Sequence, residues 1–491
     1  MGIFLMKEII RKIIKSWSAT EGNVNSTAQI LDWVAALNRD ARVSIKECES
    51  GDNSFWFYDD YVGEIHNRKR SFFSITGIQR YENNRLVAEQ PIIVQPEIGY
   101  LGIICKEIDG VINFLMQAKI EPGNVNVIQI SPTIQATKSN YTRRHGGVLP
   151  NYFNYFYNSK NYTVIYDQIQ SEQAGRFYKK RNRNIIMLLD EDIEVLPNYR
   201  WMTLGQIKQL MKIDNLVNMD TRTVLSGIPL TNCGFSEGEL SELSEYFTDK
   251  TFFHSIFTGG ITANISEIYQ FLNNYKMFEE KKTVLVPLNQ LRDWSVDDAG
   301  VTCSHEADYM VRYYDIDITG REVKQWSQPL FKAIGKAAFG LITRTVNGKK
   351  EFLVAGRPEI GSFDYIELGP SVQWEPTKKA DSDNVVDALF REKIAAHETQ
   401  YQVILSEEGG RFYHEQNHNY IVEIEPDELK ELPEGYFWID YGTTADQTST
   451  ATAIKLNKTP KYVAKVTATE LNVRSWAGAE KPKIKKWPLL K

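Results

Sequence analysis

The sequence has few cysteines and no long hydrophobic run. Its four cysteines, Cys48, Cys105, Cys233 and Cys303, are far apart and include no C-x-x-C pair, which argues against a zinc site or a disulfide framework. No apolar segment approaches the length of a membrane span, and charges interrupt the N-terminal stretch too often for a signal peptide. We therefore expect a cytoplasmic protein that does not bind membranes.

An excess of basic residues is also missing. The net charge is −6 and the isoelectric point is near 5.8, whereas nucleic-acid-binding domains usually carry basic surfaces that neutralise phosphates. Phosphate-loop, dinucleotide-binding and H-E-x-x-H motifs are absent as well. We expect no nucleic-acid partner. With 42% hydrophobic and 24% charged residues, the chain of 491 residues is long enough for about two to four globular domains.

What the sequence does contain is an internal repeat. Alternating apolar residues flank Asp109-Gly110 in the segment 100–119 and Asn347-Gly348 in the segment 339–357. This pattern is typical of β-hairpins with type I′ turns. The two turns are 238 residues apart.

Two further blocks repeat in the same order. SPTIQ (131–135) matches GPSVQ (369–373) at the same offset of 238 residues. SEQAGRFYKKRNRN (171–184) matches SEEGGRFYHEQNHN (406–419) at an offset of 235 residues. Ordered blocks at a nearly constant offset indicate tandem duplication.

The repeat predicts two homologous α+β domains, each with a mixed or antiparallel sheet and flanking helices. We place the first domain at residues 1–235, with N-terminal helices and the active site. A helical connector follows at 236–285, with its helix expected near 265–282. The second domain is expected at 286–441, and an atypical tail occupies 442–491.

Capping residues and amphipathic spacing predict further helices. Thr203 and Gln206 are spaced as a capping box, and Ser382 or Asp383 is expected to cap a helix that begins near Val385. An N-terminal helix is expected to have one apolar face, formed by Ile9, Ile10, Ile13 and Ile14.

The segment 131–147 is unusually rich in hydrogen-bond donors. Arg143 and Arg144 offer planar, bidentate donors suited to phosphate oxygens, and Tyr141 and His145 can exchange a proton. Further side chains suited to sugar hydroxyls or a base edge are Gln135, Lys138, Ser139, Asn140 and Thr142. The second copy has no such segment after Gln373. We therefore expect the first copy to hold the active pocket and the second to support it.

His414 and His418 are the candidates for metal binding, because their i, i+4 spacing suits two ligands on a helix. Their counterparts in the first copy are Lys179 and Arg183, which are not metal ligands. The repeat therefore favours a polar or cationic side chain at these positions, and we expect no metal site.

Long blocks of the first copy closely resemble the NDP-hexose 2,3-dehydratases. The resemblance covers most of residues 50–440 and is carried by QPEIGYLGI (95–103), QAKIEPGNVNVIQISPTIQATKSNYTRRHGG (117–147), QSEQAGRFYKKRNRN (170–184) and WMTLGQIKQLMKIDNLVNMDTRTVLS (201–226). It implies a homodimer of subunits with two Nudix-like domains each. It also implies an enzyme that uses no metal and no cofactor. The Nudix hydrolase signature R-E-x-x-E-E is absent, so diphosphate hydrolysis is not expected.

The resemblance further implies the reaction. A dTDP-4-keto-6-deoxy-D-glucose substrate loses water across C2 and C3 on the way to 2,6-dideoxy sugars, and a downstream 3-ketoreductase consumes the unstable diketone. The C4 ketone acidifies the C3 proton, so the site needs one base, one acid and donors for the C4 oxyanion. Candidates for acid and base are Tyr141, His145, Glu97 and Glu172, with Glu121 in the same blocks. Candidates for substrate binding are Lys119, Gln135, Ser139, Asn140, Arg143, Arg144, Arg176 and Trp201.

Structural roles compete with these assignments at several positions. Glu172 and Arg176 recur in the second copy as Glu407 and Arg411, so Glu172 is also a candidate brace for Arg176 or for a turn. In the same way, Lys119 has the counterpart Arg357, and Trp201 has the counterpart Trp438 in an apolar context.

The C-terminal residues depart from the family pattern. After Trp438 the second copy lacks the TLGQ-type helix that follows Trp201, which leaves an apolar face without a predicted cover. A Thr/Ser/Ala-rich linker leads instead to ATELNVRSWAG (468–478), which looks like a truncated bacterial SH3 piece. The alternative to the enzyme is therefore a nucleotide-sugar binding or scaffolding protein without turnover. A cell-wall protein, suggested by the tail alone, would require a signal peptide.

Overall fold

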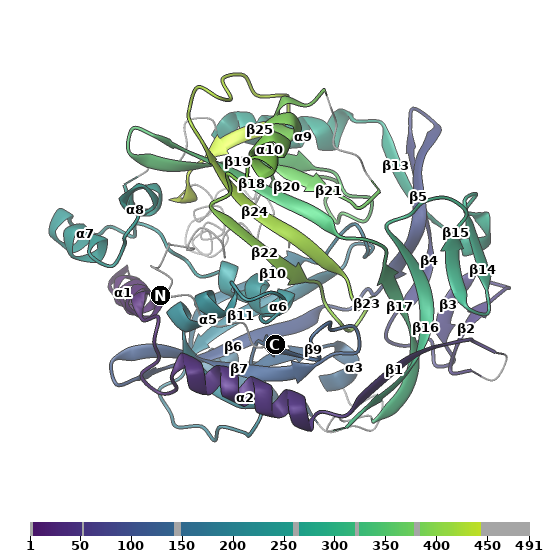
Figure 1. The fold of residues 1–491 in the computed structure, drawn as a ribbon, viewed down its shortest axis with the longest axis horizontal. Coiled ribbons are helices and arrows are strands. Elements are labelled where there is room, and N and C mark those ends of the chain that lie inside the picture. The colour runs from purple at the N-terminus through teal and green to yellow at the C-terminus, as the bar shows by residue number, and fades with distance from the viewer. Residues whose placement is uncertain are drawn as a thin grey trace.

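Four β-sheets dominate the part of the chain that the structure describes, residues 3–51, 54–141, 149–258, 265–319, 324–377 and 383–442 (Figure 1). The structure is a computed structural model. Its strands are mixed and antiparallel, and comparatively few helices flank them, which confirms the predicted α+β class.

The first seven-stranded sheet carries the segments singled out in the first copy. Its order is β10-β11-β6-β7-β12, with β9 beside β6 and β8 beside β7. The strands are β6 (Gly99–Ile108), β7 (Val111–Ile120), β8 (Ile128–Ser131), β9 (Ile134–Ala136), β10 (Thr163–Ser171), β11 (Arg181–Leu188) and β12 (Tyr199–Thr203). The β11/β6 pair is parallel and the other pairs are antiparallel.

The second seven-stranded sheet has the same arrangement. Its order is β22-β24-β18-β19, with β20 and β25 beside β19 and β21 beside β18, and its parallel pair is β24/β18. The strands are β18 (Ala337–Val346), β19 (Lys349–Arg357), β20 (Glu367–Pro370), β21 (Val372–Trp374), β22 (Tyr401–Ser406), β24 (Gln416–Ile424) and β25 (Tyr436–Ile439). The repeated sequence blocks thus fall on equivalent strands of the two sheets.

Both predicted hairpins are confirmed. Asp109 and Gly110 have φ values of 49° and 74°, and Asn347 and Gly348 have values of 51° and 73°. A type I′ turn requires positive φ at both central residues, which Asn, Asp and Gly tolerate best. These residues therefore set the register of β6 on β7 and of β18 on β19.

Two smaller sheets join the halves of the chain. In one, β13 (Lys281–Val286) pairs with β4, and in the other, β1 (Val43–Cys48) pairs with β16, so strands far apart in the sequence lie side by side (Figure 1). The remaining strands of these sheets are β2 (Trp56–Asp59), β3 (Glu64–Asn67), β4 (Ser74–Glu82), β5 (Arg85–Val94), β14 (Trp294–Asp297), β15 (Gly300–Cys303), β16 (Tyr309–Ile318), β17 (Gln325–Ala333) and β23 (Phe412–Tyr413). The sequence did not predict these pairings.

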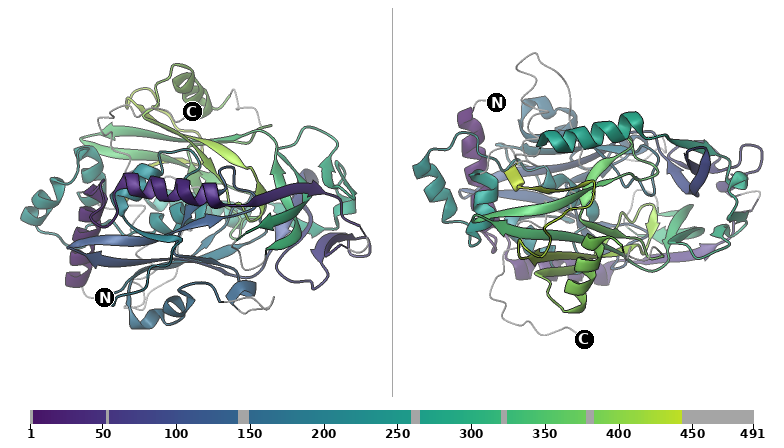
Figure 2. Two further views of the ribbon diagram at one scale, coloured as in Figure 1. Left: turned by 60° about the horizontal axis from the view of Figure 1, so that its bottom comes forward. Right: turned by 90° about the horizontal axis from the view of Figure 1, so that it is seen from above.

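The two seven-stranded sheets form separate layers in the left view of Figure 2, with helices between them and on their other faces. The helices are α1 (Ile3–Ser18), α2 (Thr27–Asp40), α3 (Lys138–Tyr141), α4 (Phe153–Tyr157), η1 (Ser159–Asn161), α5 (Leu204–Leu210), α6 (Met219–Ser226), α7 (Glu237–Ser244), α8 (Lys250–Phe257), α9 (Ile265–Phe278), η2 (Leu288–Gln290) and α10 (Val385–Ala395). Residues of α1, α2 and α5 to α9 belong to the core that lies between the two sheets, whereas α4 and α10 pack in the clusters on the other faces. Every residue of α6 is buried. No helix in the described ranges is long and apolar enough to cross a membrane.

Several predicted helix features are confirmed. The four isoleucines of α1 are buried in the central core, and Thr203 and Gln206 form the expected capping box at the start of α5. Two details were wrong. Asn384, directly before the first helical residue, caps α10 in place of Ser382 or Asp383. The connector helix ends at Phe278, because Lys281–Val286 pair with β4 instead.

The apolar face of the second sheet is covered by α8 from the connector. The ring of Phe252 lies 6.4 Å from that of Phe352 and 5.5 Å from that of Tyr441. The hydroxyl of Ser255 accepts a hydrogen bond from the backbone N–H of Tyr441. The first half has the matching contact, because the N–H of Leu204 donates to the hydroxyl of Ser16 in α1, so α8 corresponds to α1 and not to the helix that follows Trp201. Of the predicted tail, 442–491, residues 443–491 lie outside the described residues.

Candidate active site

The donor-rich segment leaves the first sheet at β9. Thr133 anchors it, because its hydroxyl bonds to the carbonyl of Leu115 in β7 and accepts from the N–H of Ile104 in β6. The amide oxygen of Asn140 accepts from the N–H of Thr137 at 3.0 Å. The ring of Tyr141 stacks on that of Phe153 at 5.3 Å. The predicted site residues Arg143, Arg144 and His145 lie outside the described residues, as does the side chain of Ser139.

Glu121 lies at the centre of the polar groups beside this segment. It follows β7, and its carboxylate is 3.2 Å from the ammonium of Lys119. The amide of Gln135, in β9, donates to the same carboxylate at 3.0 Å. The side-chain amide of Asn218 donates to Gln135 at 3.2 Å, and its side-chain oxygen caps the N-terminus of α6. The Glu121 side chain is thus positioned by β7, β9 and α6 together.

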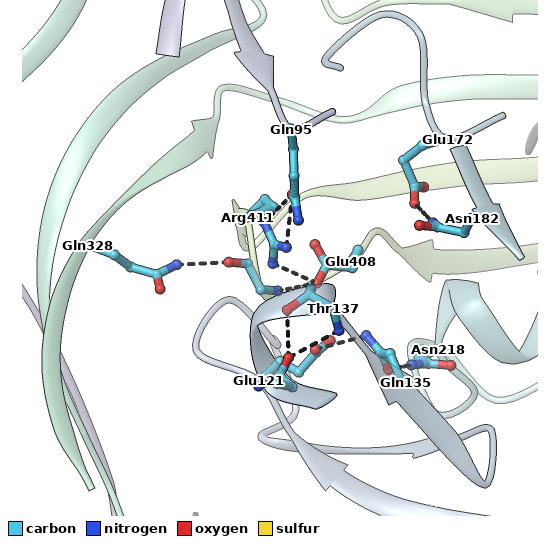
Figure 3. Close-up of polar contacts among 12 residues, drawn as sticks. Gln95, Glu121, Gln135, Thr137, Glu172, Asn182, Asn218, Gln328, Glu408 and Arg411 are labelled. Atoms are coloured by element: carbon cyan, nitrogen blue, oxygen red, sulfur yellow. Dashed lines mark hydrogen bonds and ion pairs between the residues drawn. The ribbon is translucent and has the colours of Figure 1, made fainter. Parts of the chain in front are cut away.

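Two side chains from the second half reach the same place. Arg411, in the loop between β22 and β23, donates to Gln95 at 3.0 Å and lies 3.4 Å from the carboxylate of Glu408. Gln95 donates to Glu97 at 2.8 Å. Figure 3 shows Glu408 and Arg411 between Gln95 and Glu121, with Glu172 and Asn182 to one side. The site therefore contains groups from both halves of the chain.

Glu172 and Lys180 complete this arrangement on the side of β10 and β11. Asn182 donates a hydrogen bond to the buried carboxyl of Glu172, which follows β10. The ammonium of Lys180 donates to the backbone carbonyl of Glu97 at 2.5 Å. We call the charged groups gathered here the mixed-charge cluster; they are Lys119, Glu121, Glu172, Lys180, Asp220, Glu408 and Arg411.

Burial shifts several groups of the mixed-charge cluster toward their neutral forms. It raises the pKa of Glu408 to about 7; Arg411 opposes the shift, and the charges of Glu121 and Glu172 add to it. Burial also raises the pKa of Glu172, and it holds that of Asp220 well above the ordinary aspartate value, with Glu172 and Glu408 contributing. The pKa of Lys180 falls to about 8, mainly through burial. Buried groups tuned toward neutral pH are typical of acid–base sites.

The second half has an equivalent set of residues with different charges. Glu359 takes the place of Glu121 and accepts from Gln373 at 2.9 Å. Glu375 and Glu415 take the places of Thr137 and Lys180, and their carboxylates lie 3.2 and 3.7 Å from Arg176. In the first half, the equivalent positions hold Thr137, which is uncharged, and Lys180, which is a cation.

The structure brings many of the predicted site residues together. Glu97, Glu172, Lys119 and Gln135 lie at the mixed-charge cluster. The phenol of Tyr141 is close enough to Glu97 for the carboxylate to add to the rise in the tyrosine pKa that burial causes. Asn140 is tied to Thr137 beside them.

Other predicted residues lie elsewhere. Arg176 pairs with carboxylates of the second half, and Glu172 bonds to Asn182 without bracing Arg176. Trp201 is 7% exposed and packs in an apolar cluster of the first sheet. These positions set both residues apart from the mixed-charge cluster.

Sequence reasoning did not select Glu408, Arg411, Asp220 or Lys180. Comparison of the two copies offered one signal, because Gln173 corresponds to Glu408 and Lys180 corresponds to Glu415. The two members of each pair differ in charge. A site that one copy has lost would show this kind of change.

The two histidines considered for metal binding do not share a helix. His414 has a φ of 56° between β23 and β24, and His418 lies within β24. Within the described ranges, no group of three or more His, Cys, Asp or Glu side chains is placed to hold a metal ion.

Comparison with known proteins identifies the family. The family model described as NDP-hexose 2,3-dehydratase matches residues 27–228 and 265–457. Similar proteins include dTDP-4-dehydro-6-deoxy-alpha-D-glucopyranose 2,3-dehydratases of Saccharopolyspora spinosa, 38% identical over 79% of this chain and 81% of the relative, and of Streptomyces violaceoruber, 35% identical over 85% and 91%. A third, from Amycolatopsis orientalis, is 32% identical over 87% of this chain and 88% of the relative. This chain belongs to the NDP-hexose 2,3-dehydratase family.

Proposed function

We propose that this protein is a hydro-lyase that removes water across C2 and C3 of dTDP-4-keto-6-deoxy-D-glucose. The observation that carries the proposal is the match, along most of both chains, to relatives that are named for this activity. The product is the 3,4-diketo-2,6-dideoxy sugar nucleotide. Because this diketone is unstable, a 3-ketoreductase is the expected next enzyme in 2,6-dideoxy sugar biosynthesis.

The chemistry matches the groups of the mixed-charge cluster. A base removes the C3 proton, and the electrons pass to the C4 oxygen to give an enolate. An acid then protonates the C2 hydroxyl, which leaves as water, and the resulting enol tautomerises to the diketone. The cluster offers carboxyl groups for both proton transfers, and Lys119 and Lys180 are cations able to stabilise an oxyanion. This sequence of steps needs neither a metal nor a redox cofactor.

Substrate binding is assigned to the first half. We place the sugar between the mixed-charge cluster and α3, where Lys119, Gln135 and Asn140 lie beside the acid–base candidates Tyr141, Glu97 and Glu172. The diphosphate is assigned to Arg143 and Arg144, because arginine binds phosphate oxygens in a bidentate manner. Ser139 remains a candidate for substrate binding and His145 a candidate for acid or base. Arg176 and Trp201 remain predictions from the sequence.

We further propose that the two halves are Nudix-like domains that arose by duplication, with boundaries near residues 235, 286 and 441. The shared strand order of the two seven-stranded sheets supports this proposal. A homodimer and a cytoplasmic location are also proposed. The unpaired state of the four cysteines is consistent with a reducing compartment.

Turnover by the purified protein tests the proposal. The protein is incubated with dTDP-4-keto-6-deoxy-D-glucose, EDTA, and a 3-ketoreductase with its nicotinamide cofactor to trap the diketone. The expected product is a dTDP-2,6-dideoxy sugar, identified by mass spectrometry. Unchanged substrate, together with calorimetric binding of dTDP, would favour a nucleotide-sugar binding protein instead.

A further inference from the structure

The two halves exchange loops at the mixed-charge cluster. The loop between β22 and β23, which belongs to the second sheet, lies against the turn that follows β7 of the first. The N–H of Gly123 donates to the carbonyl of Gly409 at 2.7 Å, and the N–H of His414 donates to the carbonyl of Gly123 at 2.9 Å. The first half makes the reciprocal contact, because Gly361 donates to Ala174 at 2.8 Å.

Glycines make this close approach possible. A Cβ atom on Gly123 would lie 1.6 Å from the carbonyl oxygen of Phe412, and one on Gly409 would lie 2.3 Å from the amide oxygen of Asn124. Both distances are far below van der Waals contact, so no larger residue fits without moving backbone. The contact brings Glu408, the neighbour of Gly409, beside Glu121.

The loop also fixes the direction of Glu408. The N–H of Gly410 donates to its carboxyl at 3.2 Å, and Gln328 holds the carbonyl of Gly410 at 2.8 Å. The side chain of Glu408 is 12% exposed. Glu408 is therefore nearly buried, and its position depends on the contact between the halves.

Glu121 and Glu408 differ in their polar contacts. Lys119 forms an ion pair with Glu121 and Gln135 donates a hydrogen bond to it, and such contacts stabilise a carboxylate. Burial raises the pKa of Glu408 to about 7, and the charges of Glu121 and Glu172 add to this rise, whereas Arg411, 3.4 Å away, opposes it. A carboxylate held by a cation and an amide, beside a second carboxyl whose pKa is raised, is the usual arrangement for a paired base and acid.

We propose that Glu408, supplied by the second half of the chain, is the catalytic acid that protonates the C2 oxygen as it leaves, and that Glu121 is the base that removes the C3 proton. The inference rests on the proposed dehydratase function. The proton on C3 passes to Glu121, and the electron pair of the C3–H bond moves toward the C4 oxygen to give an enolate. The C4 carbonyl then re-forms, a C2–C3 double bond forms and the C2–O bond breaks. The departing hydroxyl takes the proton of Glu408 and leaves as water. The second half is thus part of the active site as well as its support.

Glu408→Gln tests this assignment, with Glu415→Gln as its matched control. Glu415 follows in the same chain segment, is also nearly buried, and has a pKa of about 7, but it faces Arg176 of the other residue set. Each protein is incubated with substrate in D2O, and both elimination and deuterium incorporation at C3 are followed by NMR, with an enzyme-free sample as the background.

The acid role predicts that E408Q loses elimination by about 100-fold or more, while deuterium still enters C3. Enolate formation by Glu121 continues, but the hydroxyl cannot leave. Wild-type turnover should fall as the pH rises through about 7, and E408Q should lack this dependence. E415Q should keep both activities. The structure of each variant is checked by circular dichroism and by dTDP binding.

Three results would overturn the assignment. Elimination by E408Q within a few-fold of the wild-type rate would show that Glu408 transfers no essential proton. Loss of C3 exchange together with elimination, in a folded variant that binds dTDP, would give Glu408 a role before the acid step. Equal losses in E415Q would point to a general effect of altering the loop. A wild-type protein without turnover would instead contradict the proposed function itself.

Discussion

Gly123→Ala tests whether contact between the two halves organises the site. The added methyl group would lie 1.6 Å from the carbonyl oxygen of Phe412 and 2.9 Å from that of Gly409, both of which are backbone atoms. The clash can be relieved only if the loop of the second half moves away. Glu408 and Arg411 belong to that loop, so the change reaches the mixed-charge cluster without altering any of its side chains.

The expected loss of stability follows from two contributions. Overpacking a tight contact costs about 1–3 kcal/mol. Gly123 makes two hydrogen bonds to the second half, with Gly409 in the loop at 2.7 Å and with His414 after β23 at 2.9 Å, and each contributes about 0.5–1.5 kcal/mol. We therefore expect the free energy of unfolding to fall by about 2–6 kcal/mol and turnover of the folded protein to fall with it.

Urea denaturation and steady-state kinetics measure the two effects. Gly238→Ala is the control, because this position lies in α7 and a Cβ there meets no atom within 4 Å. It should stabilise the protein by up to about 1 kcal/mol and leave turnover unchanged. A G123A protein with wild-type stability and wild-type turnover would refute the close approach and, with it, the dependence of the site on the second half.

Two further predictions concern stability. Burial raises the pKa of Glu415 from the ordinary glutamate value of 4.5 to about 7, so wild-type stability should fall as the pH rises between these values. Between pH 5 and 8, E415Q should lose about 2–3 kcal/mol less stability than the wild type. Equal losses of the two proteins in urea denaturation would contradict this. Arg222 is 1% exposed and donates to the carbonyls of Val217 and Ser406 at 2.8 and 3.1 Å. Arg222→Leu should therefore lower the free energy of unfolding by about 2–5 kcal/mol. An unchanged urea midpoint would show that these bonds are dispensable.

Local features of the fold could be predicted because neighbouring residues determine them. The hairpin turns at Asp109-Gly110 and Asn347-Gly348 depend on residues that tolerate positive φ, and the capping box of α5 depends on Thr203 and Gln206 alone. The cap of α10 was missed because the candidates Ser382 and Asp383 lie directly before Asn384 and belong to the same class of capping residues.

Long-range features could not be predicted in this way. The pairing of β13 with β4 joins residues about two hundred positions apart, and nothing in Lys281–Val286 specifies that partner. The residues of the candidate site show the same difference between local and long-range features. Glu97, Glu172 and Lys119 were selected because they lie in recognisable blocks, whereas Glu408 becomes a site residue only through the contact of Gly409 with Gly123.

The central claim is that elimination takes place at the mixed-charge cluster of the first half and not at the equivalent residues of the second. Glu121 and Glu359 allow a direct comparison, because they occupy equivalent positions and accept from glutamine amides at 3.0 and 2.9 Å. The measurement is turnover of dTDP-4-keto-6-deoxy-D-glucose by Glu121→Gln and Glu359→Gln. The account predicts a loss of about 100-fold or more in E121Q and turnover within a few-fold of wild type in E359Q. An active E121Q beside an inactive E359Q would contradict it.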